Sequence, residues 1–317
     1  MPYFRLSVIV PLYNCLPLTR AMVASLRASL PDDLDHEIIL VDDGSTDGTR
    51  EWLAGLGAPF RVILNERNLG YGAANNRGAA VAQGEFLALL NNDLVLAPGW
   101  IEPMLQAHAW LRSRAGVVGN LQLDARTGAL DHAGIFINHK GKPEHDRTPR
   151  WRLRLRNRLK PLRRVPAVTG ACVLIQHELW RQLRGFDEGY VNGCEDVDFC
   201  LRAAAAGYRN VVALHSVVRH HVSTSPGRKG RDEANTYRLT QRWRNTLVTL
   251  GIRSWCRHHL ETYLPDPRDF PDPALARQVA LYLLHLRRNP PPGAYPGMGA
   301  AIQVEIDRWR AMLGENA

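Results

Sequence analysis

The chain has 317 residues, of which 45% are hydrophobic and 22% are charged. This composition indicates a folded globular protein and excludes intrinsic disorder, and no stretch reaches the ~18 uncharged apolar residues of a membrane-spanning helix. The five cysteines form no C-x-x-C pair, so we expect reduced thiols rather than disulfides or a zinc site. The first ten residues lead into a strand-like segment with no sign of a signal peptide, so we expect a cytoplasmic location.

The net charge of +9 comes from one segment. Between Lys140 and Arg164, eleven basic residues stand against two acidic ones, and the rest of the chain is neutral. Basic and apolar residues alternate from Arg150 to Lys160, and this period of two predicts a half-buried strand. The segment is either a solvated loop or edge strand, or a docking site for an anionic partner such as an acidic glycan, a lipid diphosphate or a membrane surface.

The first hundred residues alternate between strand-like and helix-like segments. Four short apolar runs predict strands over residues 6–10, 37–41, 61–64 and 86–90. The segments between them are long enough for crossover helices, one of which is expected over 75–83 and ends at Gly84. This alternation predicts a parallel sheet flanked by helices, and ligands of such sheets bind beyond the carboxyl ends of the strands.

The rest of the chain contains a segment of mixed strands and helix, followed by a helical segment. We expect strands over 171–175 and 211–214, and between them a helix over 195–206 that ends at Gly207. Beyond about residue 225 the sequence is helical and interrupted by prolines. One helical face is expected to carry Leu275, Val279, Leu283 and Leu286.

Polar residues follow the predicted strands. They are Pro11-Leu12-Tyr13-Asn14 after the first, Asp42-Asp43-Gly44-Ser45 after the second, Asn91-Asn92-Asp93 after the fourth, and His220-His221 after the last. Asp42 and Asp43 suit a turn, but they could also accept hydrogen bonds from a base or a ribose. Asp93 could hold Mg²⁺ or Mn²⁺, provided that phosphate oxygens and an imidazole complete the coordination shell.

A pair of acids, Glu195-Asp196, opens the predicted helix over 195–206. Acids at a helix start are favoured by the helix dipole, whatever else they do. Asp196 follows Gly193 and a loop, where a carboxylate could take a proton from an attacking hydroxyl.

The order of these motifs resembles the family 2 glycosyltransferases, which are inverting enzymes of the GT-A fold that use nucleotide sugars. The resemblance covers roughly residues 5–225. The matching stretches are Val8 to Asn14, Ile39 to Thr49, Asn68-Leu69-Gly70, Asn75 to Gly78, Leu89 to Asp93, Pro98-Gly99-Trp100, Gly170-Ala171-Cys172, Gly185 to Glu188 and Glu195 to Asp198. The family has a D-x-D motif where this chain has Asn91-Asn92-Asp93, so only the last carboxylate is kept, as in rhamnosyltransferase-like members.

The resemblance implies an α/β protein of the GT-A type, with a Rossmann-like, mostly parallel sheet flanked by helices and a C-terminal helical extension. Residues 1–225 would form the catalytic domain and residues 226–317 a helical region. Asp196 and Glu195 would be the catalytic residues, with Asp196 as the base. Asp93 and His220 would hold Mn²⁺ or Mg²⁺, with His221 as the alternative to His220. The nucleotide sugar would be bound by Pro11, Tyr13, Asp42, Asp43, Asn76, Arg77, Asn92 and Asp93, and the acceptor side would carry Gly170 and Trp243.

The implied reaction moves a sugar from a nucleoside-diphosphate sugar to a hydroxyl of a glycan, a glycolipid or another cell-surface polysaccharide precursor. Residues 140–164 could bring the protein to the inner face of the cytoplasmic membrane through anionic lipid. A nucleotidyltransferase is an alternative, but it would need a glycine-rich basic loop where Leu12 to Cys15 stand. A nucleic-acid-binding protein is a second alternative, but Trp151 is the only aromatic residue of the basic segment, so no nucleic acid is expected.

Overall fold

The structure is a computed structural model, and it describes residues 5–149, 153, 161–221, 229–264 and 272–314. The chain divides into two compact units, one of residues 1–135 and 145–228 and the other of residues 136–144 and 229–317. The segment 136–144 thus joins the second unit, which the sequence separated only near residue 225. The strand predicted over 150–160 lies outside the described residues apart from Leu153. All five cysteines are free thiols.

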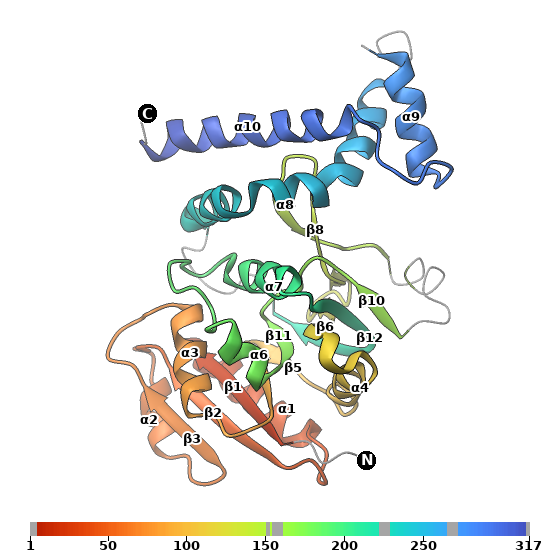
Figure 1. Ribbon diagram of the computed structural model, residues 1–317. Helices are drawn as coiled ribbons and strands as arrows, with labels where there is room; N and C mark the ends of the chain where they lie inside the picture. Colours follow the sequence, from red (N-terminus) through yellow and green to blue (C-terminus); the bar gives the residue numbers. More distant parts are fainter. Residues whose placement is uncertain (1–4, 150–152, 154–160, 222–228, 265–271, 315–317) are drawn as a thin grey trace. The chain divides into compact units, whose positions relative to one another are not determined.

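The first unit is built on a ten-stranded sheet with the order β10-β12-β6-β11-β4-β1-β2-β3, in which β5 pairs with β12 and β7 with β6 (Figure 1). The strands are β1 (Leu6–Leu12), β2 (His36–Asp42), β3 (Phe60–Leu64), β4 (Phe86–Leu90), β5 (Leu94–Val95), β6 (Ala115–Asp124), β7 (Leu130–His132), β10 (Leu162–Arg164), β11 (Cys172–Gln176) and β12 (Arg209–His220). β1 to β4 are parallel, which confirms the four predicted strands and their crossovers. β11 runs antiparallel between β4 and β6.

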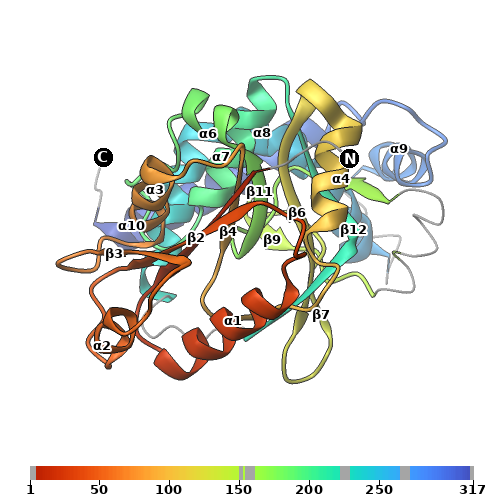
Figure 2. The same cartoon turned by 90° about the horizontal axis from the view of Figure 1, so that it is seen from below.

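Helices cover both faces of this sheet. They are α1 (Leu16–Ser29), α2 (Thr49–Ala54), α3 (Tyr71–Val81), α4 (Glu102–Leu111), a 3₁₀ turn (Arg112–Arg114), α6 (His177–Gln182) and α7 (Glu195–Ala205). Figure 2 shows α1 and α3 on opposite sides of β1 and β2. The alternation within β1 explains both layers, because Val8 and Val10 join the core with α1 while Ile9 faces α3. A Cβ on Gly78 of α3 would lie 2.5 Å from Ile9 Cγ2, so glycine allows this close packing.

Several element boundaries differ from the prediction, two of them by four residues or more. α3 begins four residues earlier than predicted, because the chain turns at Gly70 with a φ of 95° and Asp43 accepts a hydrogen bond from the Gly70 amide. β12 is longer than the predicted 211–214 and reaches His220, since it pairs with β6 along most of its length. His220 is therefore the end of a strand rather than part of a following loop.

The second unit consists of helices and a short hairpin. Its elements are β8 (Ile135–Ile137) and β9 (Pro143–His145), whose outer residues belong to the first unit, together with α8 (Lys229–Tyr263), α9 (Pro273–Leu283) and α10 (Ala294–Leu313). This confirms the predicted C-terminal helices. Leu275, Val279 and Leu283 pack in one cluster as predicted, but the placement of Leu286 on that face was wrong. The chain turns at His285, where φ is 62°, so Leu286 lies beyond the helix. No helix among the described residues is long and apolar enough to cross a membrane.

A network of charged side chains holds the hairpin of the second unit to its helices. Lys142 Nζ lies 2.9 Å from Glu305 Oε2 and 3.5 Å from Glu233 Oε2. Arg308 pairs with both glutamates, and the indole of the buried Trp309 donates to Glu233. Burial alone would raise the pKa of Glu305, but the hydrogen bonds and charges of Lys142 and Arg308 hold it below its ordinary 4.5.

We expect the second unit to lose stability in acid and Glu305→Gln to flatten that dependence. Because the folded-state pKa of Glu305 is lowered, the stabilisation is complete above the unfolded-state value and is lost as the pH falls through the folded-state value. Urea unfolding of both proteins, followed by circular dichroism from about pH 6 to about pH 3, measures the difference. Asp307→Asn is the control, because Asp307 is exposed on the same helix. A pH dependence identical in wild type and Glu305→Gln would contradict the prediction.

Candidate active site

The polar segments that follow β1, β2 and β4 meet at one edge of the sheet. The parallel register aligns Leu12 with Asp42, so the two strands end together. The Asp43 amide donates to the Leu12 carbonyl at 2.7 Å, and β4 runs parallel on the other side of β1. Pro11 is buried within β1, and Tyr13 projects from this edge with 49% of its surface exposed. The edge thus brings together Pro11, Tyr13, Asp42 and Asp43, four of the residues that the sequence analysis assigned to the nucleotide sugar.

Asp42 lies beneath this edge rather than on its surface. Its side chain is fully buried, and one oxygen accepts a hydrogen bond from Arg50 Nε at 2.8 Å. Both oxygens also lie 3.3 Å from the Ser45 amide. Arg50 neutralises the carboxylate, and the backbone contacts close the Asp-Gly-Ser turn. Asp42 therefore supports the shape of the edge, and its oxygens have partners within the protein.

Asp43 organises the start of α3. Its oxygens accept hydrogen bonds from the Leu69 and Gly70 amides at 2.9 and 2.8 Å. Asn65 Nδ2 donates to the same carboxylate at 2.7 Å, and Arg77 donates to Asn65 Oδ1 at 2.6 Å. The exposed Arg77 is therefore oriented through Asn65, which the sequence analysis had not singled out. The signal for this arrangement is the Asn-Leu-Gly run immediately before the helix.

Asn76 is turned away from this arrangement. Its Oδ1 accepts from the Phe186 amide at 2.9 Å, while its Nδ2 donates to the Phe186 carbonyl at 3.0 Å and to Glu188 Oε1 at 2.8 Å. These contacts occupy both polar atoms of the amide. Asn76 ties α3 to the loop before α7, and its assignment to the nucleotide sugar stays a prediction.

Asp93 and His220 meet at the same edge. β5 pairs with β12 so that His220 is opposite Leu94, and this register brings His220 Nε2 to 3.1 Å from Asp93 Oδ1. Both side chains are about nine-tenths buried. His221 contributes only its amide, which donates to the Asp93 carbonyl at 3.0 Å. Of the two adjacent histidines, His220 is thus the one whose ring lies against the carboxylate.

The turn that bears Asp93 is held to the neighbouring segments by Asn92. Asn92 Nδ2 donates to Thr19 Oγ1 of α1 at 2.9 Å and lies 3.4 Å from the Asn14 carbonyl. This amide ties the turn after β4 to the segment after β1. No group of three His, Cys, Asp or Glu side chains among the described residues is arranged to hold a metal ion. The chain itself offers one carboxylate and one imidazole to a cation, a set that fits Mn²⁺ or Mg²⁺ when phosphate oxygens supply the other ligands.

The acids at the start of α7 differ in burial, and each accepts a hydrogen bond within the protein. Glu195 is buried, and its Oε2 accepts from the Gly193 amide at 2.6 Å, which holds the loop before the helix. Asp198 is fully buried against Arg202 at 2.7 Å. Asp196 is only partly buried, and its Oδ2 accepts from the Gly170 amide at 2.7 Å. Its Oδ1 accepts from the Val197 amide at 2.7 Å, and Asp196 is thus the acid of this group that is partly exposed to solvent.

Tyr71 was missed by the sequence analysis although it contacts the same segment. Its hydroxyl donates to the Gly170 carbonyl at 2.7 Å, and its amide donates to Asn192 Oδ1 at 2.9 Å. Burial raises the pKa of Tyr71 well above its ordinary value, and the negative charges of Glu195 and Asp196 raise it further. The hydroxyl is therefore a permanent donor. Tyr71 links the first turn of α3 to the peptide that holds Asp196.

We expect Tyr71→Phe to destabilise the first unit by about 1–3 kcal/mol, because it leaves the Gly170 carbonyl without its hydrogen-bond donor. The midpoint of urea unfolding measures this loss. Tyr13→Phe is the matched control, since that exposed ring has no hydrogen bond to lose among the described contacts. Equal midpoints for wild type and Tyr71→Phe would show that the hydrogen bond does not support the loop.

Trp243 belongs to the second unit. It lies within α8 at the one position with non-helical torsion angles, φ −115° and ψ 18°, where the long helix kinks. Arg242 stacks over its ring at 5.7 Å. The assignment of Trp243 to the acceptor side stays a prediction.

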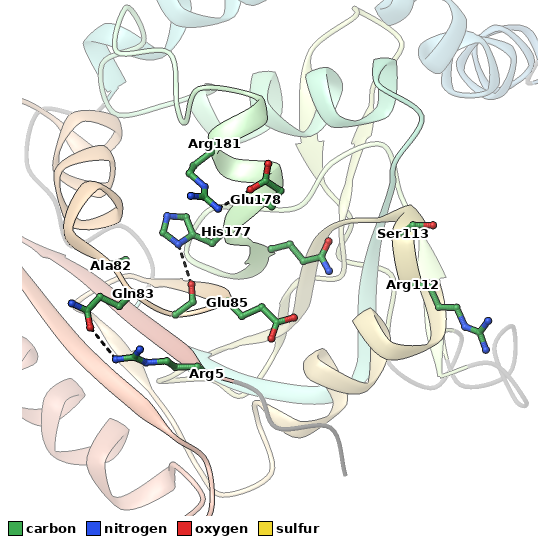
Figure 3. Close-up of a pocket in the computed structure, with 11 residues that line it drawn as sticks. Arg5, Ala82, Gln83, Glu85, Arg112, Ser113, His177, Glu178 and Arg181 are labelled. Carbon is green, nitrogen blue, oxygen red and sulfur yellow. Dashed lines mark hydrogen bonds and ion pairs between the residues drawn. The ribbon is translucent and has the colours of Figure 1, made fainter.

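A broad hollow of about 930 Å³ lies at the opposite end of the strands (Figure 3). Its lining comes from the segments before β1 and β4 and from the end of β11, where His177 Nδ1 contacts the Gly84 carbonyl at 3.0 Å. Arg5 donates to Gln83, and Arg181 pairs with Glu178. Its charges are mixed and largely paired, and it includes none of the predicted site residues. It is therefore not the candidate site.

The comparisons with known proteins agree on one family. The family model described as Glycosyl transferase family 2 matches residues 7–182. An N-acetylglucosaminyl-diphospho-decaprenol L-rhamnosyltransferase of Mycobacterium tuberculosis is 30% identical over 276 residues, which cover 80% of this chain and 86% of that relative. The O-antigen biosynthesis protein RfbC of Myxococcus xanthus is 33% identical over 234 residues, which cover 70% of this chain.

Other matches are partial or concern the fold. Uncharacterized protein y4gI of Sinorhizobium fredii is 32% identical over 87% of this chain. The chain spans 29% of the length of y4gI and 18% of RfbC. The crystal structure of GalNAc-T7 with UDP, GalNAc and Mn²⁺ superposes with a TM-score of 0.61 at 19% identity, over 89% of this chain and 55% of that one. This likeness shows a shared GT-A fold. By its family match and its relatives, the chain belongs to glycosyl transferase family 2.

Proposed function

We propose that the chain is an inverting glycosyltransferase in which Asp196 is the base and the Asp93–His220 pair holds a divalent cation. One observation carries this proposal. The segment 170–171 contacts both elements, because the Gly170 amide donates to Asp196 at 2.7 Å and the Ala171 carbonyl accepts from the Asn91 amide at 2.9 Å. The base and the turn that bears Asp93 are therefore fixed to adjacent peptides, as a single displacement at one sugar carbon requires.

The proposed reaction uses Asp196, the partly exposed carboxylate at the start of α7, as the base. Asp196 takes the proton of the acceptor hydroxyl while the acceptor oxygen attacks the anomeric carbon. The bond from that carbon to the diphosphate oxygen breaks, and the nucleoside diphosphate leaves with the electron pair. The Gly170 and Val197 amides orient Asp196, each through one carboxylate oxygen. With one base and no carboxylate nucleophile, the substitution occurs once and inverts the anomeric configuration.

Asp93 and His220 would hold Mn²⁺ or Mg²⁺ together with the donor diphosphate. A bound cation would offset the negative charge that develops on the leaving group. GalNAc-T7 was solved with UDP and Mn²⁺, and we extend the use of a nucleotide sugar and a divalent cation from that fold relative to this chain. The imidazole of His220 beside a carboxylate favours Mn²⁺, which accepts nitrogen as well as oxygen ligands.

The nucleotide sugar, which is the sugar donor, would lie on the edge formed after β1 and β2. Pro11, Tyr13 and Asp43 would line the nucleoside side, supported from below by Asp42, and Arg77 and Asn92 would lie toward the diphosphate. Tyr13 has an exposed ring available for stacking on a base. Gly170 lies beside Asp196, where the acceptor hydroxyl must arrive.

Rhamnosyl transfer to a glycan or to a lipid-linked acceptor is the specific activity that we propose. The Mycobacterium tuberculosis relative is named an L-rhamnosyltransferase acting on N-acetylglucosaminyl-diphospho-decaprenol. The catalytic domain would be residues 1–225 with the helical region 226–317 appended. The protein would work at the cytoplasmic face of a membrane, with the basic segment 140–164 in peripheral contact.

A panel of nucleotide sugars with Mn²⁺ tests the proposal by thermal shift, because at a fixed ligand concentration a ligand of higher affinity stabilises the folded state more. The donor that raises Tm is then offered to candidate acceptors, and NMR of the product reports the anomeric configuration. We expect a Mn²⁺-dependent shift for one deoxyhexose donor and an inverted product. A retained configuration, or stabilisation by nucleoside triphosphates alone, would contradict the proposal.

A further inference from the structure

The turn between α9 and α10 exposes two leucines to solvent. Leu284 is 67% exposed and Leu286 is 73% exposed, and they follow directly on the end of α9. The helix itself buries its apolar residues in the second unit, where Val279 is fully buried. The exposed leucines are therefore additional to the packed face of α9.

The backbone of this turn is held in place by hydrogen bonds. The Leu281 carbonyl accepts from the amides of Leu286 and Arg287 at 2.9 and 3.1 Å, which closes the helix end. Arg253 of α8 donates to the Leu283 carbonyl at 3.1 Å, and its guanidinium lies 3.2 Å from His285 Nε2. The leucines are thus presented by a folded turn rather than by a frayed helix end.

The charge of the same region has one sign. Residues 273–304, which include α9, the turn and the first half of α10, contain no Asp or Glu. Arg287 and Arg288 follow the leucines, and Arg288 is exposed. Tyr295, at the start of α10, is 44% exposed. Exposed leucines beside arginines and an aromatic ring, with no acid nearby in sequence, are the composition of a surface that lies in the interface of an anionic bilayer.

We propose that residues 284–296, which comprise the turn after α9 and the start of α10, form a membrane-docking surface, with Leu284 and Leu286 inserted among the headgroups of anionic lipids (Figure 1). Arg287 and Arg288 would lie at the level of the lipid phosphates, and Tyr295 would take the amphipathic position at the boundary. The area of three apolar side chains is far smaller than the ~800 Å² per partner that a stable protein interface buries, which favours a lipid surface over a protein partner. The proposal concerns a surface other than residues 140–164 and does not depend on the reaction.

Flotation of the full chain with lipid vesicles tests this surface. We expect the protein to float with vesicles of phosphatidylcholine and phosphatidylglycerol, and to stay behind with phosphatidylcholine alone. Leu284→Asp/Leu286→Asp should lower the partition coefficient at least about tenfold, because it replaces the inserted side chains with charges. Arg287→Gln/Arg288→Gln should lower it about fivefold for each arginine removed.

A matched control separates this surface from general effects of charge. Leu64→Asp/Trp110→Asp makes the same change in net charge at two exposed positions of the first unit, and we expect it to float like wild type. Failure of the wild type to float with anionic vesicles would overturn the proposal. So would equal flotation of wild type and Leu284→Asp/Leu286→Asp, or loss of binding only when Arg152, Arg154 and Arg156 are changed to Glu. Sedimentation velocity without lipid completes the test, since self-association through the two leucines would assign the turn to a dimer contact.

Discussion

Asp196→Asn is expected to reduce turnover by about 10²–10⁴-fold while leaving donor binding intact. The substitution removes the proton acceptor but keeps a side chain of the same size, whose amide oxygen can still accept one of the two bonds from the Gly170 and Val197 amides. Donor binding is measured by thermal shift with the nucleotide sugar and Mn²⁺, and turnover by release of nucleoside diphosphate at saturating acceptor. A general base acts only on the attacking hydroxyl, so kcat should fall with little change in the donor Kd.

Glu195→Gln is the matched control for this experiment. Glu195 is next in sequence, but it is buried and accepts from the Gly193 amide, a bond that glutamine can still accept. We expect its turnover to stay within about a factor of ten of wild type, as for loss of one charge from a hydrogen bond. A large loss in Glu195→Gln with little loss in Asp196→Asn would move the base to Glu195. Full activity in Asp196→Asn would remove the assignment altogether.

The parallel half of the fold could be predicted because its signals are local. The runs at β1, β2 and β4 are continuous and apolar, which is typical of strands buried on both faces, and glycine marks the end of the helix α7. The extent of β12 could not be predicted, because the strand continues beyond Leu214 by pairing with β6. That long-range pairing brings His220 next to Asp93.

The sequence predicted which types of residue lie at the site. It could not predict which of their side chains are already bonded within the protein. Asp42 and Asp43 are adjacent in sequence, yet Asp42 is neutralised by Arg50 and Asp43 anchors the amides before α3. Asn76 has the right position for a donor contact, but its amide is bonded to the Phe186 peptide. Such assignments depend on tertiary contacts, which for Asn76 join residues 110 positions apart and which no local pattern contains. Tyr71 was missed for the same reason, since its partner is Gly170.

His220→Gln is expected to weaken Mn²⁺ binding about tenfold or more, and Asp93→Asn is expected to do so at least as strongly. Each removes one of the two ligands that the chain offers to the cation, and turnover should fall about a hundredfold or more. Electron paramagnetic resonance of free Mn²⁺ in the presence of the nucleoside diphosphate measures affinity without any turnover. Excess Mn²⁺ should restore part of the activity of both variants, which a purely structural defect would not allow.

His221→Gln provides the comparison that decides between the two neighbouring histidines. His221 meets Asp93 only through its backbone amide, which the substitution leaves in place, whereas the His220 ring lies 3.1 Å from the carboxylate. His221→Gln should therefore bind Mn²⁺ like wild type. If His221→Gln lost the ion and His220→Gln kept it, the ligand would be His221. If neither substitution nor Asp93→Asn changed Mn²⁺ affinity, the cation site would have to lie elsewhere. It would then be built from other ligands, because no other carboxylate–imidazole contact as close as 3.1 Å occurs among the ion pairs of the described residues.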